Sequence, residues 1–190
     1  MNLGGAMPPG VALSPELDGT NGRTAGLCRP PGVLTVFSVE DNMAQATAIS
    51  PQALIDVAKA TVTTYNDRDW AKAKTILTSD FVYDEIATGR KVNSADQAIE
   101  LWKGWAQAFP DSKGTVQNAR ATNDGTVTLE VTWKGTHKGP LHTPTGPIAP
   151  TGKSIEVRAC AVLEIAGERA RAERHYFDMA TLLRQIGVNG

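Results

Sequence analysis

Two long segments in which apolar and polar residues alternate constrain the fold most strongly. In residues 126–137, threonine, lysine and glutamate occupy every second position, and the positions between them are Val127, Leu129, Val131, Trp133, Gly135 and His137. Residues 154–165 repeat the pattern, with Ile155, Val157, Ala159, Ala161, Leu163 and Ile165 on one parity. A period of two is typical of a strand with one buried face. The segments predict two neighbouring strands of one antiparallel sheet with a polar outer face.

Helical signals come before these strands. Ser50 with Pro51, Asp69, and Ser94 with Gln97 are N-cap signals that predict helices over about 50–66, 69–77 and 94–109. A short strand is expected over 81–86, a third long strand over 170–177, and a last helix over 179–186 that ends at Gly187. Helices first and strands afterwards favour an α+β fold, in which a sheet is folded over helices on one face.

The chain divides near residue 43. Residues 1–42 hold seven of the 18 glycines and five of the 11 prolines but no lysine. This composition predicts a flexible N-terminal extension, followed by a single domain over residues 43–190. A secretory signal is the competing interpretation, but nothing basic precedes Arg23 and the apolar run at 33–39 is short. Met43 reads like a native start, so the extension could also be upstream or added sequence.

Charge and cysteine content exclude several classes of function. The chain has 19 Lys and Arg against 20 Asp and Glu, so it has no basic field for nucleic acid. It also has no apolar run of the roughly 20 residues that cross a bilayer. Cys28 and Cys160 do not indicate a disulfide framework, and we therefore expect a cytoplasmic location. The sequence has neither a glycine-rich phosphate loop nor a Gly-x-Ser-x-Gly nucleophile motif.

Two side chains are the first candidates for chemistry. His137 ends the apolar face of its strand beside Gly135, where it is either a core histidine or a pocket group. Asp178 lies where the last strand meets the last helix, so it is either an N-cap or, if it is desolvated, a general base.

Strand parity assigns the neighbours of Asp178. It puts Arg174 and Tyr176 on the same face as Asp178, and Glu173, His175 and Phe177 on the other. We expect the first face to be the inner one, with Tyr176 as a possible donor to an oxyanion and His175 outside. The three histidines His137, His142 and His175 match no known zinc spacing, so no metal site is predicted.

The segment 138–153 is rich in glycine and proline and also contains Leu141 and Ile148. A loop of this length is expected to act as a lid or to form a wide hairpin.

Three ordered motifs resemble the SnoaL-like polyketide cyclase family, also called ester cyclases, of the NTF2-like superfamily. They are Ala108–Asp111, Gly135–Pro140 followed by Ala149–Lys153, and Tyr176–Asp178 leading into Leu182–Gly187. The resemblance implies an NTF2-like cone, in which a curved antiparallel sheet wraps around the N-terminal helices and encloses a concave apolar pocket. It also implies a homodimer or higher homo-oligomer, and an enzyme that needs no cofactor.

The resemblance further implies roles for individual residues. Asp178 matches the family's acid/base carboxylate, His137 a strand position that faces the pocket, and Tyr176 a position where classical cyclases place a histidine. The implied reaction is proton abstraction α to a carbonyl and intramolecular aldol-type ring closure on a small apolar polyketide or ester-like substrate. His137 and Tyr176 would hydrogen-bond the enolate oxygen. The expected pocket residues are Trp102, Trp105, Phe109, Trp133 and Arg174.

Other functions remain open on the same scaffold. One is a non-catalytic module for small-molecule binding or dimerisation, which is favoured if Asp178 is solvated and only caps the last helix. Others are a ketosteroid-isomerase-like proton transfer and an epoxide-hydrolase-like activation of water. The last needs two acids, which Asp178, Arg174 and Tyr176 do not supply.

Overall fold

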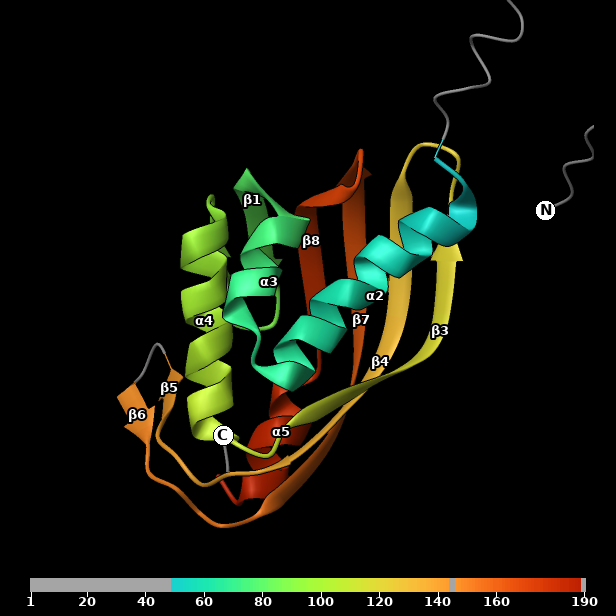
Figure 1. Ribbon diagram of the computed structural model, residues 1–190. Helices are drawn as coiled ribbons and strands as arrows, with labels where there is room; N and C mark the ends of the chain where they lie inside the picture. Colours follow the sequence, from blue (N-terminus) through green and yellow to red (C-terminus); the bar gives the residue numbers. More distant parts are fainter. Residues whose placement is uncertain (1–48, 144–145, 189–190) are drawn as a thin grey trace, which may run out of the picture.

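One strongly curved six-stranded sheet, with helices packed inside its curve, makes up most of the computed structural model (Figure 1). The structure describes residues 49–143 and 146–188. The predicted extension over residues 1–42 and the start at Met43 lie outside the described residues. The predicted α+β fold with its curved sheet is confirmed.

Four helices begin where their caps were expected. They are α2 (Pro51–Asp67), α3 (Trp70–Ile76), α4 (Ala95–Ala108) and α5 (Met179–Ile186). The side chains of Ser50, Asp69 and Ser94 each accept a hydrogen bond from a backbone amide in the first turn of their helix. Gly187 ends α5 in the left-handed conformation at φ 82°, which glycine adopts without steric cost. Local capping chemistry therefore fixes where the helices start and stop.

The large sheet has the strand order β2-β1-β8-β7-β4-β3. Its strands are β1 (Leu77–Glu85), β2 (Arg90–Val92), β3 (Lys113–Ala121), β4 (Thr126–Thr136), β7 (Ser154–Ala166) and β8 (Arg169–Phe177). Strand β4 pairs antiparallel with β7 along its whole length, from Thr126 opposite Glu164 to Thr136 opposite Ser154, as the alternation predicted. The β1–β8 pair is parallel, and the remaining pairs are antiparallel.

The segment 138–153 contains a small hairpin of β5 (Leu141–Thr143) and β6 (Gly146–Ile148), so the wide-hairpin alternative is the observed one. Its first residues are tied to the end of α4, because the amides of Lys138 and Gly139 both donate to the carbonyl of Ala108 at 3.0 Å. A Cβ on Gly139 would lie 2.1 Å from the carbonyl oxygen of Gln107. Only glycine permits this close approach.

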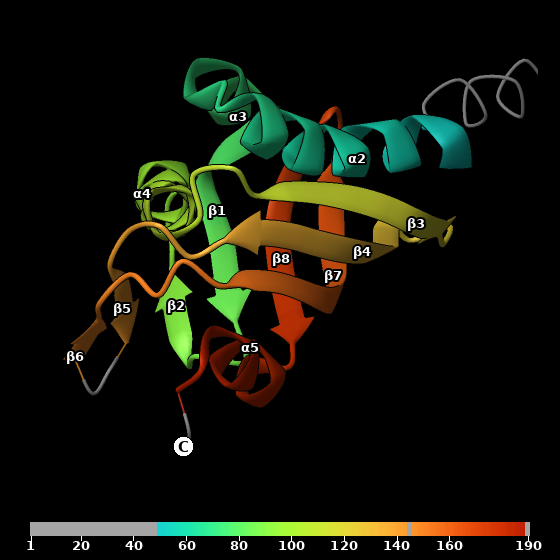
Figure 2. The same cartoon turned by 90° about the horizontal axis from the view of Figure 1, so that it is seen from below.

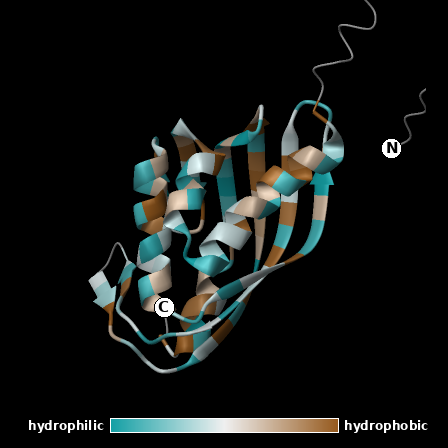
Figure 3. Cartoon of the chain, viewed as in Figure 1, coloured by the Kyte–Doolittle hydropathy of each residue, from teal (hydrophilic) through white to brown (hydrophobic). Residues whose placement is uncertain are grey.

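Two groups of buried side chains fill the inside of the curve. The larger lies between α2, α3, α4 and the sheet, and the smaller joins α5 to β7 and to the hairpin through residues such as Leu141, Ile155 and Leu182. Figure 2 shows α2 beside β3, and α5 beyond the end of β8. Apolar and polar bands alternate along the strands (Figure 3), which is the pattern of a sheet with one buried face. Within the described residues, no helix is long and apolar enough to span a bilayer.

Candidate active site

A cavity of about 100 Å³ lies between the helices and the concave face of the sheet. Its walls come from α2, α4, α5, β1, β4, β7 and β8 and are mostly aromatic and aliphatic. Four of the five predicted pocket residues are among them: Trp102, Trp105, Phe109 and Trp133. The fifth, Arg174, does not line the cavity and instead binds Glu164 at 3.1 Å on the outer side of the sheet.

The face of strand β8 that lines the pocket is the one that we expected to lie outside. Glu173, His175 and Phe177 line the cavity, whereas Tyr176 is 40% exposed. The predicted parity is therefore correct, but the assignment of the inner face is wrong for Tyr176 and Arg174. The assignment placed Tyr176 inside because it shares a face with Asp178, and it fails because the interior holds Glu173 and His175, which are hydrogen-bonded to each other through Oε1 and Nδ1.

Asp178 does not enter the cavity. It is exposed and caps α5, where Oδ1 accepts from the amide of Thr181 at 3.0 Å and Oδ2 accepts from the hydroxyl of the same residue. These hydrogen bonds lower the pKa of Asp178 below its ordinary value. A solvated carboxylate with a lowered pKa is a weak base near neutral pH. The placement implied by the resemblance is corrected here, and the N-cap alternative is the observed one.

His137 is fully buried but lies outside the cavity. Its ring packs against Phe109 with the ring centroids 5.2 Å apart, and Nδ1 lies 3.2 Å from Thr151 Oγ1. Its backbone is also hydrogen-bonded to Gly152 and Lys153. Burial lowers the pKa of His137. The side chain therefore helps to hold the segment 138–153, and the expectation that it faces the pocket is wrong.

A buried pair of side chains occupies the pocket instead. His175 Nδ1 lies 2.8 Å from Glu173 Oε1, and the two side chains are only 12% and 6% exposed. The imidazole is surrounded by the rings of Tyr83, Trp133 and Phe177, at centroid distances of 6.2, 6.4 and 5.8 Å. Nδ1 is engaged by the carboxylate, so Nε2 is the ring nitrogen that remains for a ligand. The Glu-x-His spacing on a strand was a signal for this pair, because it places both side chains on one face.

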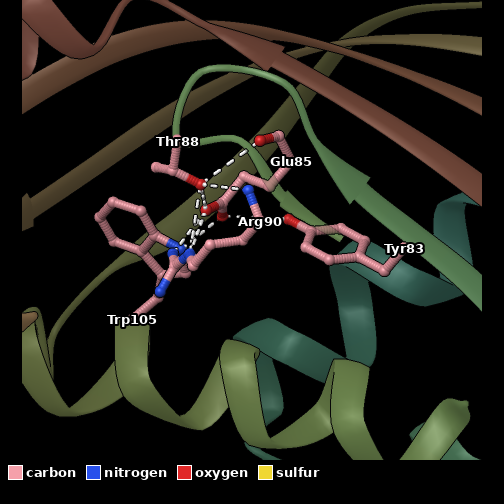
Figure 4. A network of polar contacts seen from close by, with 5 residues as sticks. All are labelled: Tyr83, Glu85, Thr88, Arg90 and Trp105. Carbon is pink, nitrogen blue, oxygen red and sulfur yellow. Dashed lines mark hydrogen bonds and ion pairs between the residues drawn. The ribbon is translucent and has the colours of Figure 1, made fainter. Parts of the chain in front are cut away.

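A second carboxylate, Glu85, lies at the pocket wall and is 1% exposed. Figure 4 shows it among its polar neighbours. Oε1 accepts from Trp105 Nε1 at 2.6 Å, and Oε2 accepts from Thr88 Oγ1 at 2.5 Å and from Arg90 Nε at 2.8 Å. The guanidinium of Arg90 also lies 5.5 Å from the ring centroid of Trp105. With both oxygens occupied, Glu85 holds the indole and the β1–β2 turn in place.

Tyr83 lies between the two carboxylates. Its hydroxyl is 3.4 Å from Glu85 Oε1. Burial, together with the charges of Glu85 and Glu173, raises the pKa of Tyr83 well above its ordinary value. The phenol therefore stays protonated and can act only as a hydrogen-bond donor or acceptor.

A third polar group lies where α2 meets the start of β3. The hydroxyls of Tyr65 and Ser112 are 2.9 Å apart and both residues line the cavity. Arg68 donates to Ser112 Oγ at 3.0 Å and places its guanidinium 4.4 Å from the centroid of the Tyr65 ring. Burial raises the pKa of Tyr65. This group fixes the orientation of the Tyr65 ring.

The described residues contain no cluster of three or more His, Cys, Asp or Glu side chains arranged to hold a metal ion. An imidazole oriented by a carboxylate within apolar walls can accept and return a proton.

Comparisons with known proteins agree with this architecture. Residues 55–186 match the family model described as SnoaL-like polyketide cyclase. A comparison with curated protein sequences found no match.

Solved structures share the fold. A proposed SnoaL-like polyketide cyclase from Jannaschia sp. CCS1 superposes with a TM-score of 0.65 at 16% identity, covering 74% of this chain and 95% of that one. AclR, a proposed hydroxylase from Streptomyces galilaeus, has a TM-score of 0.62 at 24% identity and covers 73% and 83%. IdmH, a proposed polyketide cyclase from Streptomyces antibioticus, has a TM-score of 0.61 at 22% identity and covers 71% and 99%. Neighbours with different assigned activities show that the fold alone does not select a reaction.

Proposed function

The chain belongs to the SnoaL-like polyketide cyclase family, and we propose that it is an acid/base enzyme in which His175 removes a proton from a carbon next to a carbonyl group. The substrate is a small, mostly apolar compound that fits among the aromatic walls of the cavity. One observation carries the proposal: His175 Nδ1 contacts Glu173 Oε1 inside an apolar pocket.

The pair assigns the roles of the two ring nitrogens. When Nδ1–H donates to the Glu173 carboxylate, the proton is held on Nδ1 and Nε2 keeps its lone pair. Nε2 then accepts the α proton of the substrate, and the electrons of the broken C–H bond move to the carbonyl oxygen to form an enolate. Glu173 stabilises the imidazolium that results, without taking the proton itself.

Ring closure uses the proton that His175 has accepted. The enolate carbon attacks a second carbonyl of the same substrate, a C–C bond forms, and the oxygen of that carbonyl becomes an alkoxide. His175 returns its proton to the alkoxide, so the histidine ends the cycle neutral. Apolar walls favour this sequence because they exclude water from the reactive enolate.

A second candidate is activation of water for hydrolysis. The objection from the sequence was the lack of two acids, but Glu85 and Glu173 both line the cavity. The hydrogen bonds that occupy both oxygens of Glu85 make it the weaker proposal. A non-catalytic binding module is the third candidate, and the exposed Asp178 that caps α5 meets the criterion that favours it. The buried pair of Glu173 and His175 is the observation that supports an enzyme instead.

Exchange of α protons with solvent tests the proposal without knowledge of the natural substrate. A bicyclic ketone such as β-tetralone is incubated with the protein in deuterium oxide, and loss of its α-proton signals is followed by NMR. We expect exchange above the buffer rate for the wild type and not for His175→Gln. Hydrolysis of styrene oxide without ketone exchange would favour the second candidate instead.

A further inference from the structure

The indole N–H of Trp133 makes no hydrogen bond within the described part of the protein. Trp133 extends from β4 into the cavity, and its Nε1 is buried without a hydrogen-bond partner among the described residues. The indole of Trp105, also at the wall, donates to Glu85 at 2.6 Å. A buried indole N–H usually has an acceptor, because leaving it unpaired is costly. The unpaired donor therefore indicates a ligand that supplies an acceptor.

The indole packs against Gly114, at a position where a larger residue would not fit. Gly114 lies opposite Trp133 in the β3–β4 ladder, and a Cβ on Gly114 would lie 2.7 Å from the indole Cζ3. Asn66 fixes the backbone of Gly114, donating to its carbonyl at 2.8 Å and accepting from its amide at 2.7 Å. The ring of Tyr65 packs edge-on against the indole with the centroids 4.9 Å apart. Such fixed donors are what preorganised stabilisation of a developing charge requires.

The indole that carries this donor lies beside the imidazole of the proposed base. The ring centroids of Trp133 and His175 are 6.4 Å apart, and both side chains line the same cavity. A carbonyl oxygen and the α proton beside it belong to adjacent atoms of a substrate. A donor and a base that act on one carbonyl unit must therefore come from neighbouring side chains, as these two do.

The charges at the cavity indicate which carbonyl compounds it accepts. Among the described residues that line it there is no lysine or arginine, whereas two carboxylates, Glu85 and Glu173, are present. Arg90 already pairs with Glu85, so a substrate carboxylate would face Glu173 with no lysine or arginine among the described lining residues to pair with it. A neutral ketone or ester meets no such repulsion.

We infer that Trp133 Nε1–H is the hydrogen-bond donor to the carbonyl oxygen of a neutral ketone or ester substrate, on which His175 acts. This inference rests on the proposed function, because it names the partner of the enolate oxygen in the same reaction. It gives Trp133 the role that the resemblance had assigned to His137 and Tyr176.

The direct test uses the indole N–H signals of the ¹⁵N-labelled wild-type protein. The Trp133 signal is assigned from its loss in Trp133→Phe, and β-tetralone is compared with tetralin, the hydrocarbon of the same shape. We expect the ketone to move the Trp133 indole proton downfield and tetralin to leave it in place. The Trp105 signal, already engaged by Glu85, serves as the internal control. Equal effects of the two ligands on Trp133, or no binding of the ketone, would overturn the inference.

An activity measurement separates this inference from the proposed function. In Trp133→Phe the exchange rate constant at saturating β-tetralone should fall about tenfold to hundredfold, with tetralin affinity within about twofold of the wild type. Full exchange activity in Trp133→Phe would overturn the inference and leave His175 as base. A ketone-specific shift of the Trp133 signal without exchange in the wild type would overturn the proposed reaction and keep the indole as a carbonyl-binding group.

Discussion

His175 and Glu173 lie two residues apart on β8, and their side chains meet at 2.8 Å on the face that lines the cavity. The period of a strand brings them together, since residues i and i+2 project from the same side. The two polar residues are tolerated in an apolar interior because the carboxylate gives the imidazole a hydrogen-bond partner. A buried ionisable pair need not stabilise the fold, and in the proposed function this one moves protons.

Glu173→Gln tests whether the carboxylate orients the imidazole. The amide nitrogen of glutamine can donate to Nδ1, which would leave the proton on Nε2 and remove the lone pair that accepts the substrate proton. We expect the exchange rate constant of β-tetralone to fall at least about tenfold, with little change in KM. Glu164→Gln, on the outer side of the sheet next to Arg174, should keep wild-type kinetics. An equal loss in both variants would point to a general effect of removing charge from the sheet.

Gly114→Ala tests the packing that positions Trp133. The added methyl group would lie 2.7 Å from the indole ring, so the ring or the β3 backbone must move. We expect the free energy of unfolding in urea to fall by about 1–3 kcal/mol. Gly104→Ala is the matched control, because Gly104 lies in α4 with no atom within 4 Å of its Cβ position. That change should raise the stability by up to about 1 kcal/mol through helix propensity, and a similar gain from Gly114→Ala would contradict the packing described here.

Arg90→Gln tests the network around Glu85. The substitution removes the cation that faces a carboxylate with 1% exposure, and it should lower the free energy of unfolding by about 3 kcal/mol. The neighbouring ion pair of Lys91 and Asp84 is 3.4 Å long and more exposed. Lys91→Gln should therefore cost less than about 1 kcal/mol in the same urea titration. Equal costs would mean that the buried network contributes no more than a surface ion pair.

His137 should make the stability of the protein depend on pH. Its pKa is lowered by burial in the folded state, so the unfolded chain binds the proton more readily. The contribution to stability is therefore complete above the ordinary pKa of 6.5 and is lost as the pH falls below that value toward the folded pKa. We expect Tm to fall over this range in the wild type, and to fall less in His137→Leu. His142→Gln, at an exposed position, should follow the wild type; identical curves for His137→Leu and wild type would contradict this assignment.

Much of the architecture was predictable because it follows from local patterns. Alternation in residues 126–136 and 154–165 located β4 and β7 and their pairing, and the N-cap residues located the helices. Strand β3 was missed because Lys113–Ala121 mixes glycine and polar residues, and its ladder with β4 is irregular between Val116 and Asn118. The parallel pairing of β1 with β8 depends on contacts between distant segments, which no local pattern encodes.

The site was predicted less well than the fold. The aromatic walls followed from helix and strand periodicity, which correctly placed Trp102, Trp105, Phe109 and Trp133. The positions of the polar groups did not follow from periodicity, because whether a Glu and a His can be buried depends on their meeting each other in three dimensions. Asp178 was assigned by motif, and its motif position is equally that of an N-cap.

Proton exchange of β-tetralone in deuterium oxide, measured for His175→Gln and Asp178→Asn beside the wild type, shows which of the two side chains is the base. Tyr176→Phe, on the exposed face of the same strand, controls for any change in β8 itself. With His175 as the base, we expect His175→Gln to exchange at the buffer rate, whereas Asp178→Asn and Tyr176→Phe retain the wild-type rate constant. Exchange that persists in His175→Gln and disappears in Asp178→Asn would contradict it.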